Sequence, residues 1–169
     1  MLLKLFLFMK LTILILAFVF SLNTFAQTLP NFDIIKLEKA PDYKLAEPYA
    51  LQTANFILST PFKKEDKDKI NSLNFIGKWM NGTPDYSFAL GDIEDKIGKD
   101  YNVIALYMVA KTKYILENKA NAKDPKLVEL NAVTLLINYC SNKDNLVRMT
   151  KQLKKLAEAK EKGQLEQSL

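Results

Sequence analysis

The chain has 169 residues, with 24 basic and 19 acidic side chains, one cysteine and no histidine. The lack of histidine excludes Ser-His-Asp and Cys-His catalytic pairs and imidazole metal sites, and the single cysteine excludes thiolate zinc sites and an intramolecular disulfide. We therefore predict no catalytic residue, no metal site and no cofactor, and we do not expect an enzyme.

Residues 1–26 have the pattern of a cleaved signal peptide. Lys4 and Lys10 give a positive start, Leu11–Phe20 is the apolar stretch, and Thr24 and Ala26 are small residues at the positions that signal peptidase inspects. Lys10 interrupts the only candidate for a spanning helix, which needs roughly 20 apolar residues. We expect cleavage after Ala26, a mature chain without a transmembrane segment, and a periplasmic or secreted location.

Residues 27–43 lack helical spacing, lie around Pro30 and Pro41, and predict an extended arm. Four apolar side chains are expected to hold this arm on the domain surface: Phe32, Ile34, Ile35 and Leu37. Residues 44–163 are patterned as one helical domain of ordinary size, and residues 164–169 are expected to form a polar tail.

Apolar side chains recur at helical spacing in five long segments, 48–58, 65–80, 100–117, 127–140 and 141–163, with one or two uncertain turns near 91–98. Asp124 and Pro125 predict the start of the fourth helix, whose apolar surface all round predicts a place at the centre. Ser141 and Asp144 have capping-box spacing for the fifth. The fold class is all-α, an irregular bundle of about five helices, with solenoid-like hairpin pairing left open. Cys140 is expected to be a buried, inert thiol.

The stretch WMNGTPDYSF, residues 79–88, holds the only tryptophan. The apolar stripe of the second helix comprises Ile70, Leu73, Ile76, Trp79 and Met80. Trp79 is therefore predicted to lie in the core. Gly82 follows the last periodic residue, where a left-handed C-terminal cap is favoured, and Pro84 cannot continue the helix.

The second half of this stretch is the candidate binding surface, formed by Thr83, Asp85, Tyr86 and Phe88, because loops on a rigid scaffold often carry function. The other interpretation is that Tyr86 and Phe88 fold back and pack beside Trp79.

The excess of positive charge lies near the end of the chain, where Lys143–Gly163 holds seven basic and three acidic side chains. Lys151, Lys154, Lys155 and Lys162 form a secondary basic face on the last helix. This face is either an ordinary solvated surface or a contact with anionic lipid in a peripheral envelope protein. None of these residues is an arginine or an aromatic residue, so nucleic acid is not an expected partner.

A carboxylate-dependent hydrolase of cell-envelope glycans is the alternative from another class, with acid and base drawn from Asp85, Asp92, Glu94 and Asp95. An EF-hand calcium loop is not predicted, because Ile97 occupies the sixth position, where glycine is required.

Taken with ALQTANFILSTP before it and YNVIALYMVAKTKYILEN after it, WMNGTPDYSF resembles uncharacterised secreted helical proteins of Gram-negative bacteria. The resemblance implies export and an all-helical fold, and it implies no activity and no catalytic residue. We expect an exported, non-enzymatic protein that binds a protein or envelope partner.

Overall fold

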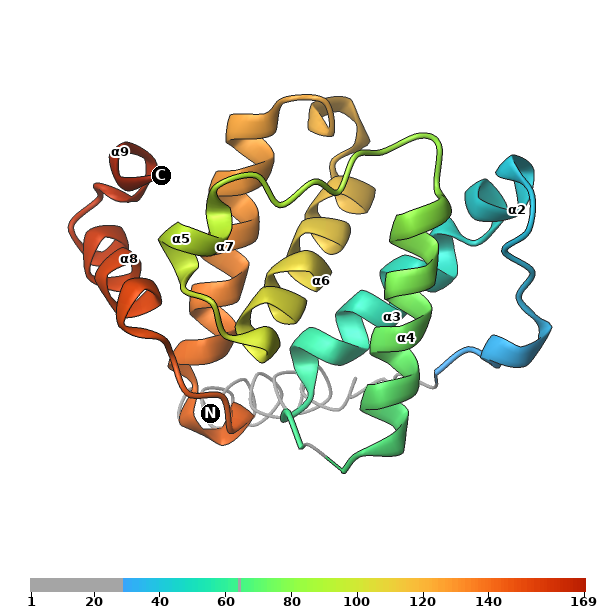
Figure 1. The fold of residues 1–169 in the computed structure, drawn as a ribbon, viewed down its shortest axis with the longest axis horizontal. Helices are drawn as coiled ribbons and strands as arrows, with labels where there is room; N and C mark the ends of the chain where they lie inside the picture. The colour runs from blue at the N-terminus through green and yellow to red at the C-terminus, as the bar shows by residue number, and fades with distance from the viewer. Residues whose placement is uncertain (1–28, 64) are drawn as a thin grey trace, which may run out of the picture.

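The computed structural model describes residues 29–63 and 65–169, and these residues form helices and no strand (Figure 1). The predicted signal peptide lies outside the described residues. The longer helices are α3 (Glu47–Ser59), α4 (Lys67–Gly82), α6 (Tyr101–Glu117), α7 (Pro125–Ser141) and α8 (Lys151–Glu161). Short helices are α2 (Ala40–Leu45), α5 (Ile93–Ile97) and α9 (Leu165–Ser168), with 3-10 turns η1 (Phe32–Ile34), η2 (Lys119–Asn121) and η3 (Lys143–Asn145). The prediction of an all-α bundle is confirmed.

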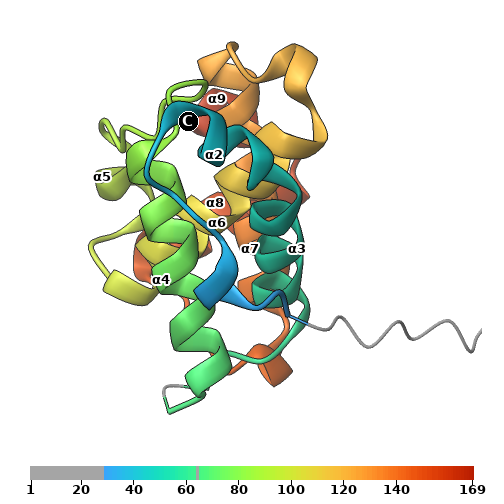
Figure 2. The ribbon, with the colours of Figure 1, turned by 90° about the vertical axis from the view of Figure 1, so that its right-hand side faces the viewer.

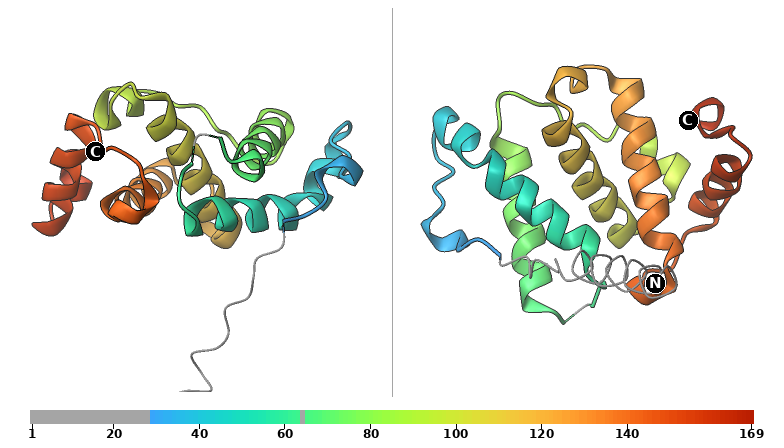
Figure 3. Two further views of the ribbon diagram at one scale, coloured as in Figure 1. Left: turned by 90° about the horizontal axis from the view of Figure 1, so that it is seen from below. Right: turned by 180° about the vertical axis from the view of Figure 1, so that it is seen from behind.

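The long helices lie side by side in the order α4, α3, α6, α7 and α8, as the views in Figures 1 and 3 show. Helix α6 packs against α7, α3, α4 and α5, so the central helix is α6 rather than the fourth predicted helix, α7. Figure 2 shows α4 and α3 facing the viewer, with α6 and α7 behind them. No helix among the described residues is both long enough and apolar enough to cross a bilayer.

Aspartates set the start of three of the long helices. The side chains of Asp66, Asp100 and Asp124 each accept hydrogen bonds from two amides in the first turn of α4, α6 and α7. The predicted start at Asp124 and Pro125 is confirmed. Near the other end of α7, burial and then the negative charge of Asp100 raise the pKa of the Cys140 thiol to about 12, which keeps it protonated.

The buried face of α4 differs from its apolar stripe. Trp79 is completely buried, as predicted, but Ile70 is exposed and the buried position beside it is held by Lys69, which is 1% exposed. Lys69 Nζ donates to the main-chain oxygens of Ile57 and Thr60, both at 2.9 Å, and to Thr60 Oγ1 at 2.7 Å. The ammonium group therefore caps the C-terminal end of α3, where the helix dipole favours a positive charge.

The prediction of a left-handed cap at Gly82 is wrong. Gly82 is the last residue of α4, it is not among the positive-φ glycines, and Thr83 is the C-terminal cap, in an extended conformation. The physical reason for a glycine is instead a close contact, because a Cβ atom at Gly82 would lie 2.1 Å from the ring of Tyr43. Tyr43 holds α2 against α4: its carbonyl oxygen accepts from Trp79 Nε1 at 2.9 Å, and its hydroxyl donates to the Leu37 oxygen at 3.0 Å.

The last long helix begins later than predicted. Ser141 ends α7, and α8 begins after Thr150, whose hydroxyl accepts from the Leu153 amide at 2.9 Å and donates to the Ile97 oxygen. Gly98 makes room for Thr150, because a Cβ atom at this position would lie 2.8 Å from the Thr150 Cβ. The φ of +88° at Gly98 is a second reason for a glycine here. The tail 164–169 is not simply polar, since it forms α9 and buries Leu165.

The arm differs from its prediction in three details. It contains the turn η1, and the chain becomes helical again at Ala40, before residue 44. Phe32, Ile35 and Leu37 pack against the core, and the Phe32 ring stacks on Phe75 with centroids 4.7 Å apart. Ile34 points into solvent, so its predicted contact with the domain is wrong.

Candidate binding site

The candidate site is the connection between α4 and α5, residues 83–92, which we call the strap. In Figure 1 it runs across the upper part of the molecule from α4 to α5, past the connection between α6 and α7. Tyr86, Phe88 and Leu90 are half-buried against the core, whereas Ser87 and Ala89 between them are exposed. This alternation is that of an extended chain lying on a surface, with every second side chain directed inward.

The two aromatic side chains of the strap pack on the tryptophan. The ring centroid of Tyr86 lies 6.0 Å from that of Trp79, and the Phe88 ring meets Trp79 edge-on at 5.7 Å. Both distances are in the range of favourable aromatic pairs. Of the two interpretations of Tyr86 and Phe88, the structure therefore shows the one in which they close the core beside Trp79.

A polar network fixes Tyr86 in this position. Its hydroxyl donates to Glu47 Oε1 at 3.1 Å, and the other oxygen of this buried carboxylate accepts from Lys119 Nζ. Burial, followed by the negative charge of Glu47, raises the pKa of Tyr86 to about 12. The network joins the strap to the start of α3 and to η2, which follows α6.

Tyr86→Phe should lower the free energy of unfolding by about 1.5 kcal/mol, because it removes a half-buried hydrogen bond to a charged acceptor. Tyr49→Phe is the matched control, because Tyr49 lies in α3 near Glu47 and its side chain is exposed. The control should change stability by less than about 0.5 kcal/mol. Denaturant unfolding of the two variants measures both values, and equal effects would contradict the network.

Lys111 of α6 fastens the strap from the other side. Its Nζ donates to the Ala89 oxygen at 3.0 Å and lies 6.0 Å from the Phe88 ring centroid. Burial lowers the pKa of Lys111, and the charge of Glu129 opposes this shift. The strap is thus held by the side chains of Tyr86 and Phe88 and by the hydrogen bond from the Lys111 side chain to the Ala89 oxygen.

A groove of about 580 Å³ lies beside the strap. The strap forms one wall, and the other is formed by α6 and the α6–α7 region, with Tyr107, Lys111, Ile115, Lys123, Val128 and Glu129. We call it the strap groove. Tyr107, Ile115 and Val128 form the floor of the groove, of which only a small part is exposed, and the rim above them is polar.

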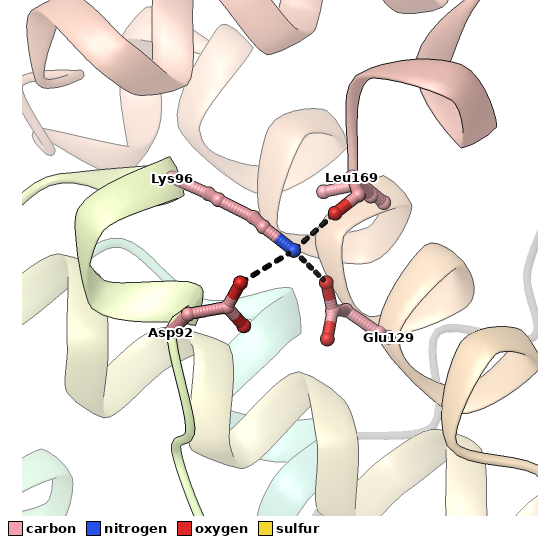
Figure 4. Close-up of polar contacts among 4 residues, drawn as sticks. All are labelled: Asp92, Lys96, Glu129 and Leu169. Atoms are coloured by element: carbon pink, nitrogen blue, oxygen red, sulfur yellow. Dashed lines mark hydrogen bonds and ion pairs between the residues drawn. The ribbon is translucent and has the colours of Figure 1, made fainter.

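Asp92, one of the four carboxylates proposed for a hydrolase, is paired with a lysine. Asp92 and Glu129 both contact Lys96 Nζ at 3.2 Å, and the main-chain oxygen of Leu169 accepts from the same ammonium group (Figure 4). The hydrogen bond with Lys96 lowers the pKa of Asp92, whereas a general acid at neutral pH needs a raised pKa. Burial disfavours the charged form of Lys96, but the hydrogen bonds to Asp92 and Glu129 outweigh it and raise the pKa of Lys96.

The other candidate residues are spread over the surface. Thr83 is half-buried and donates its amide to the Trp79 oxygen at 3.0 Å, whereas Asp85 is exposed at the groove rim. Asp95 pairs with Lys99 at 3.0 Å. The secondary basic face is exposed on the outer side of α8 at Lys151, Lys154, Lys155 and Lys162. Among residues 29–63 and 65–169, no three Cys, Asp or Glu side chains are grouped to hold a metal ion.

Comparison with protein-family models, with curated proteins and with solved structures finds no match. The resemblance to secreted Gram-negative proteins therefore stays a prediction.

Sequence reasoning missed Glu47, Lys111 and Lys119, which position the strap. Glu47 precedes Pro48 at a helix start, where an exposed carboxylate is common, and no pattern marked it as buried. Its two partners lie 39 and 72 residues away in the chain, and only the packing of α3 beside α6 brings them together.

Proposed function

We propose that this protein is an exported, non-enzymatic binding protein that holds a protein partner of the cell envelope in the strap groove. The observation that carries the proposal is the way in which the strap is held. Its inward side chains fix it to the core, while its outer side chains and the adjoining groove stay open. A rigid irregular segment beside a concave surface is the usual form of a recognition site.

The alternatives have less support. The hydrolase of envelope glycans needs a carboxyl group that is protonated near neutral pH, and Asp92 is instead held in its charged form by Lys96. The basic face of α8 carries Glu158 among its lysines, as ordinary solvated helices do. The strap groove combines a fixed frame with open polar groups.

Site-specific photo-crosslinking tests the proposal. A photoreactive residue at Ser87, in cells that export the protein, should give a discrete crosslinked product with one partner. Ser141 is the matched control position, because it is also exposed but lies at the far end of α7. The absence of a product at Ser87, or the same products at both positions, would contradict the proposal. Tyr86→Ala and Phe88→Ala are unsuitable probes, because both rings pack on Trp79.

A further inference from the structure

The main chain of the strap is unusually free of hydrogen bonds. Within the described residues, no amide of residues 85–90 donates to another residue, and only two of their carbonyl oxygens accept. These two are Ala89, which accepts from Lys111 Nζ, and Leu90, which accepts from the Ile93 amide. Main-chain groups of this kind have to be satisfied by water or by a partner.

The alternation of side chains fixes the direction of these free groups. In an extended chain the N–H and C=O of one residue point to the same side, and those of the next residue point to the opposite side. The Ala89 carbonyl points toward Lys111, which lines the strap groove. The main-chain groups of Ser87, two residues earlier, are therefore directed toward the groove as well.

We infer that the strap groove binds an extended peptide segment of the partner, which pairs with the main chain of the strap as an added strand. This inference rests on the proposed function and names the form of its partner. An extended segment is the occupant whose own alternating donors and acceptors match such an edge. Residues 85–90 span roughly 20 Å when extended, which accommodates a peptide of about six residues.

The charges of the groove favour a segment without net charge. Asp92 and Glu129 are already paired with Lys96, and Lys111 is engaged with the strap. One exposed acid, Asp85, and one exposed base, Lys123, remain at the rim. Alternate side chains of the peptide would face the apolar floor, and the main-chain hydrogen bonds would supply most of the affinity.

Ser87→Pro tests the inference, because proline removes the groove-facing amide and leaves the inward packing in place. Proline favours an extended residue before it, and Tyr86 already belongs to the extended part of the strap. Ser87→Ala is the matched control, because it keeps the amide and removes only an exposed hydroxyl. Thermal unfolding of both variants verifies that the fold is intact.

The probe is a random heptapeptide library displayed on phage and selected against the purified protein. The enriched peptide, synthesised alone, should bind Ser87→Pro at least tenfold more weakly than the unaltered protein and bind Ser87→Ala within about twofold. N-methylation at alternate peptide residues should weaken binding in a two-residue period, and this test leaves the protein untouched.

Equal binding to both variants, or insensitivity to N-methylation, would overturn the added strand. A lack of any enriched peptide, or dimerisation of the protein that Ser87→Pro abolishes, would overturn the peptide as occupant. A crosslinked partner at Ser87 together with either result would leave the proposed function standing, so the two failures are distinguishable.

Discussion

Gly82→Ala is expected to destabilise the protein by about 2–3 kcal/mol, although alanine is the better helix former. Gly82 lies in the last turn of α4, and a methyl group there would overlap the ring of Tyr43 at 2.1 Å. The ring would have to move, and it would lose its hydrogen bond to Leu37 and its contact with the end of α4. Chemical denaturation measures the change.

Two controls isolate this contact. Gly77 lies in the same helix, and no atom lies within 4 Å of the place that a Cβ atom would take there, so Gly77→Ala should stabilise the protein by up to about 1 kcal/mol. In a Tyr43→Ala background the effect of Gly82→Ala should also become stabilising, because the obstacle is gone. Stabilisation by Gly82→Ala in the unaltered protein would show that the Tyr43 contact does not govern this position.

Lys69 should make the free energy of unfolding rise with pH above about pH 8, a range in which most proteins are not stabilised further. Burial lowers the pKa of Lys69 from 10.5 to about 8, against the opposing charge of Asp66. Between these two pKa values the unfolded chain binds more protons than the folded chain, so the free energy of unfolding rises as the pH rises. Below about pH 8 both states are mostly protonated, and the cost of burying the charge is present in full.

The expected gain is about 2 kcal/mol between about pH 7 and about pH 9.5. The measurement is the difference in unfolding free energy between the unaltered protein and Lys69→Met, because titrations elsewhere in the chain cancel in this difference. Lys67→Met, at an exposed position of the same helix, is the matched control. A flat difference for Lys69→Met would mean that this ammonium group is not desolvated in the folded protein.

Burial of Lys69 also explains why the apolar pattern of α4 predicted the helix and most of its inner face but not the part beside Ile70. The pattern favoured Ile70, whereas the structure buries Lys69 and Ser72 and exposes Ile70. A lysine becomes an inner residue here because the end of α3 supplies oxygen acceptors at Ile57 and Thr60. Such acceptors belong to another helix, and no periodicity within α4 can reveal them.

Helix starts were predicted well where a local side chain decides them and poorly where a contact with a distant residue decides them. Asp124 before Pro125 is the one predicted start of the fourth helix, and α7 begins there. For the last helix the capping-box spacing of Ser141 and Asp144 predicts a start at Ser141, but α8 begins after Thr150. Thr150 is the N-terminal cap because its hydroxyl also bonds to Ile97 across the space that Gly98 leaves open.

The position of the candidate site could be predicted from the sequence. The residues that hold the strap and those that form the groove could not. The aromatic residues Tyr86 and Phe88 made this stretch a candidate binding surface. In the structure both rings pack on Trp79 and hold the strap in place, so they are not exposed for binding. The open wall at Lys123 and Val128 comes from the α6–α7 region, more than 30 residues further along the chain. Local sequence can mark an irregular aromatic segment, but only the packing of distant helices makes a groove beside it.

In the strap, side chains have a fixed position while most main-chain groups lack hydrogen bonds within the described part of the chain, although a fixed path and main-chain hydrogen bonds usually occur together. The side chains of Tyr86 and Phe88 and the carbonyl oxygen of Ala89 hold its path, while the amides of residues 85–90 have no partner among the described residues. Amide hydrogen exchange depends on hydrogen bonding of the main chain, so it will report fast exchange there, as for a loosely folded loop. The fluorescence of Trp79, on which Tyr86 and Phe88 pack, will report a fixed environment beside the same segment, and the two methods will describe one strap in opposite terms.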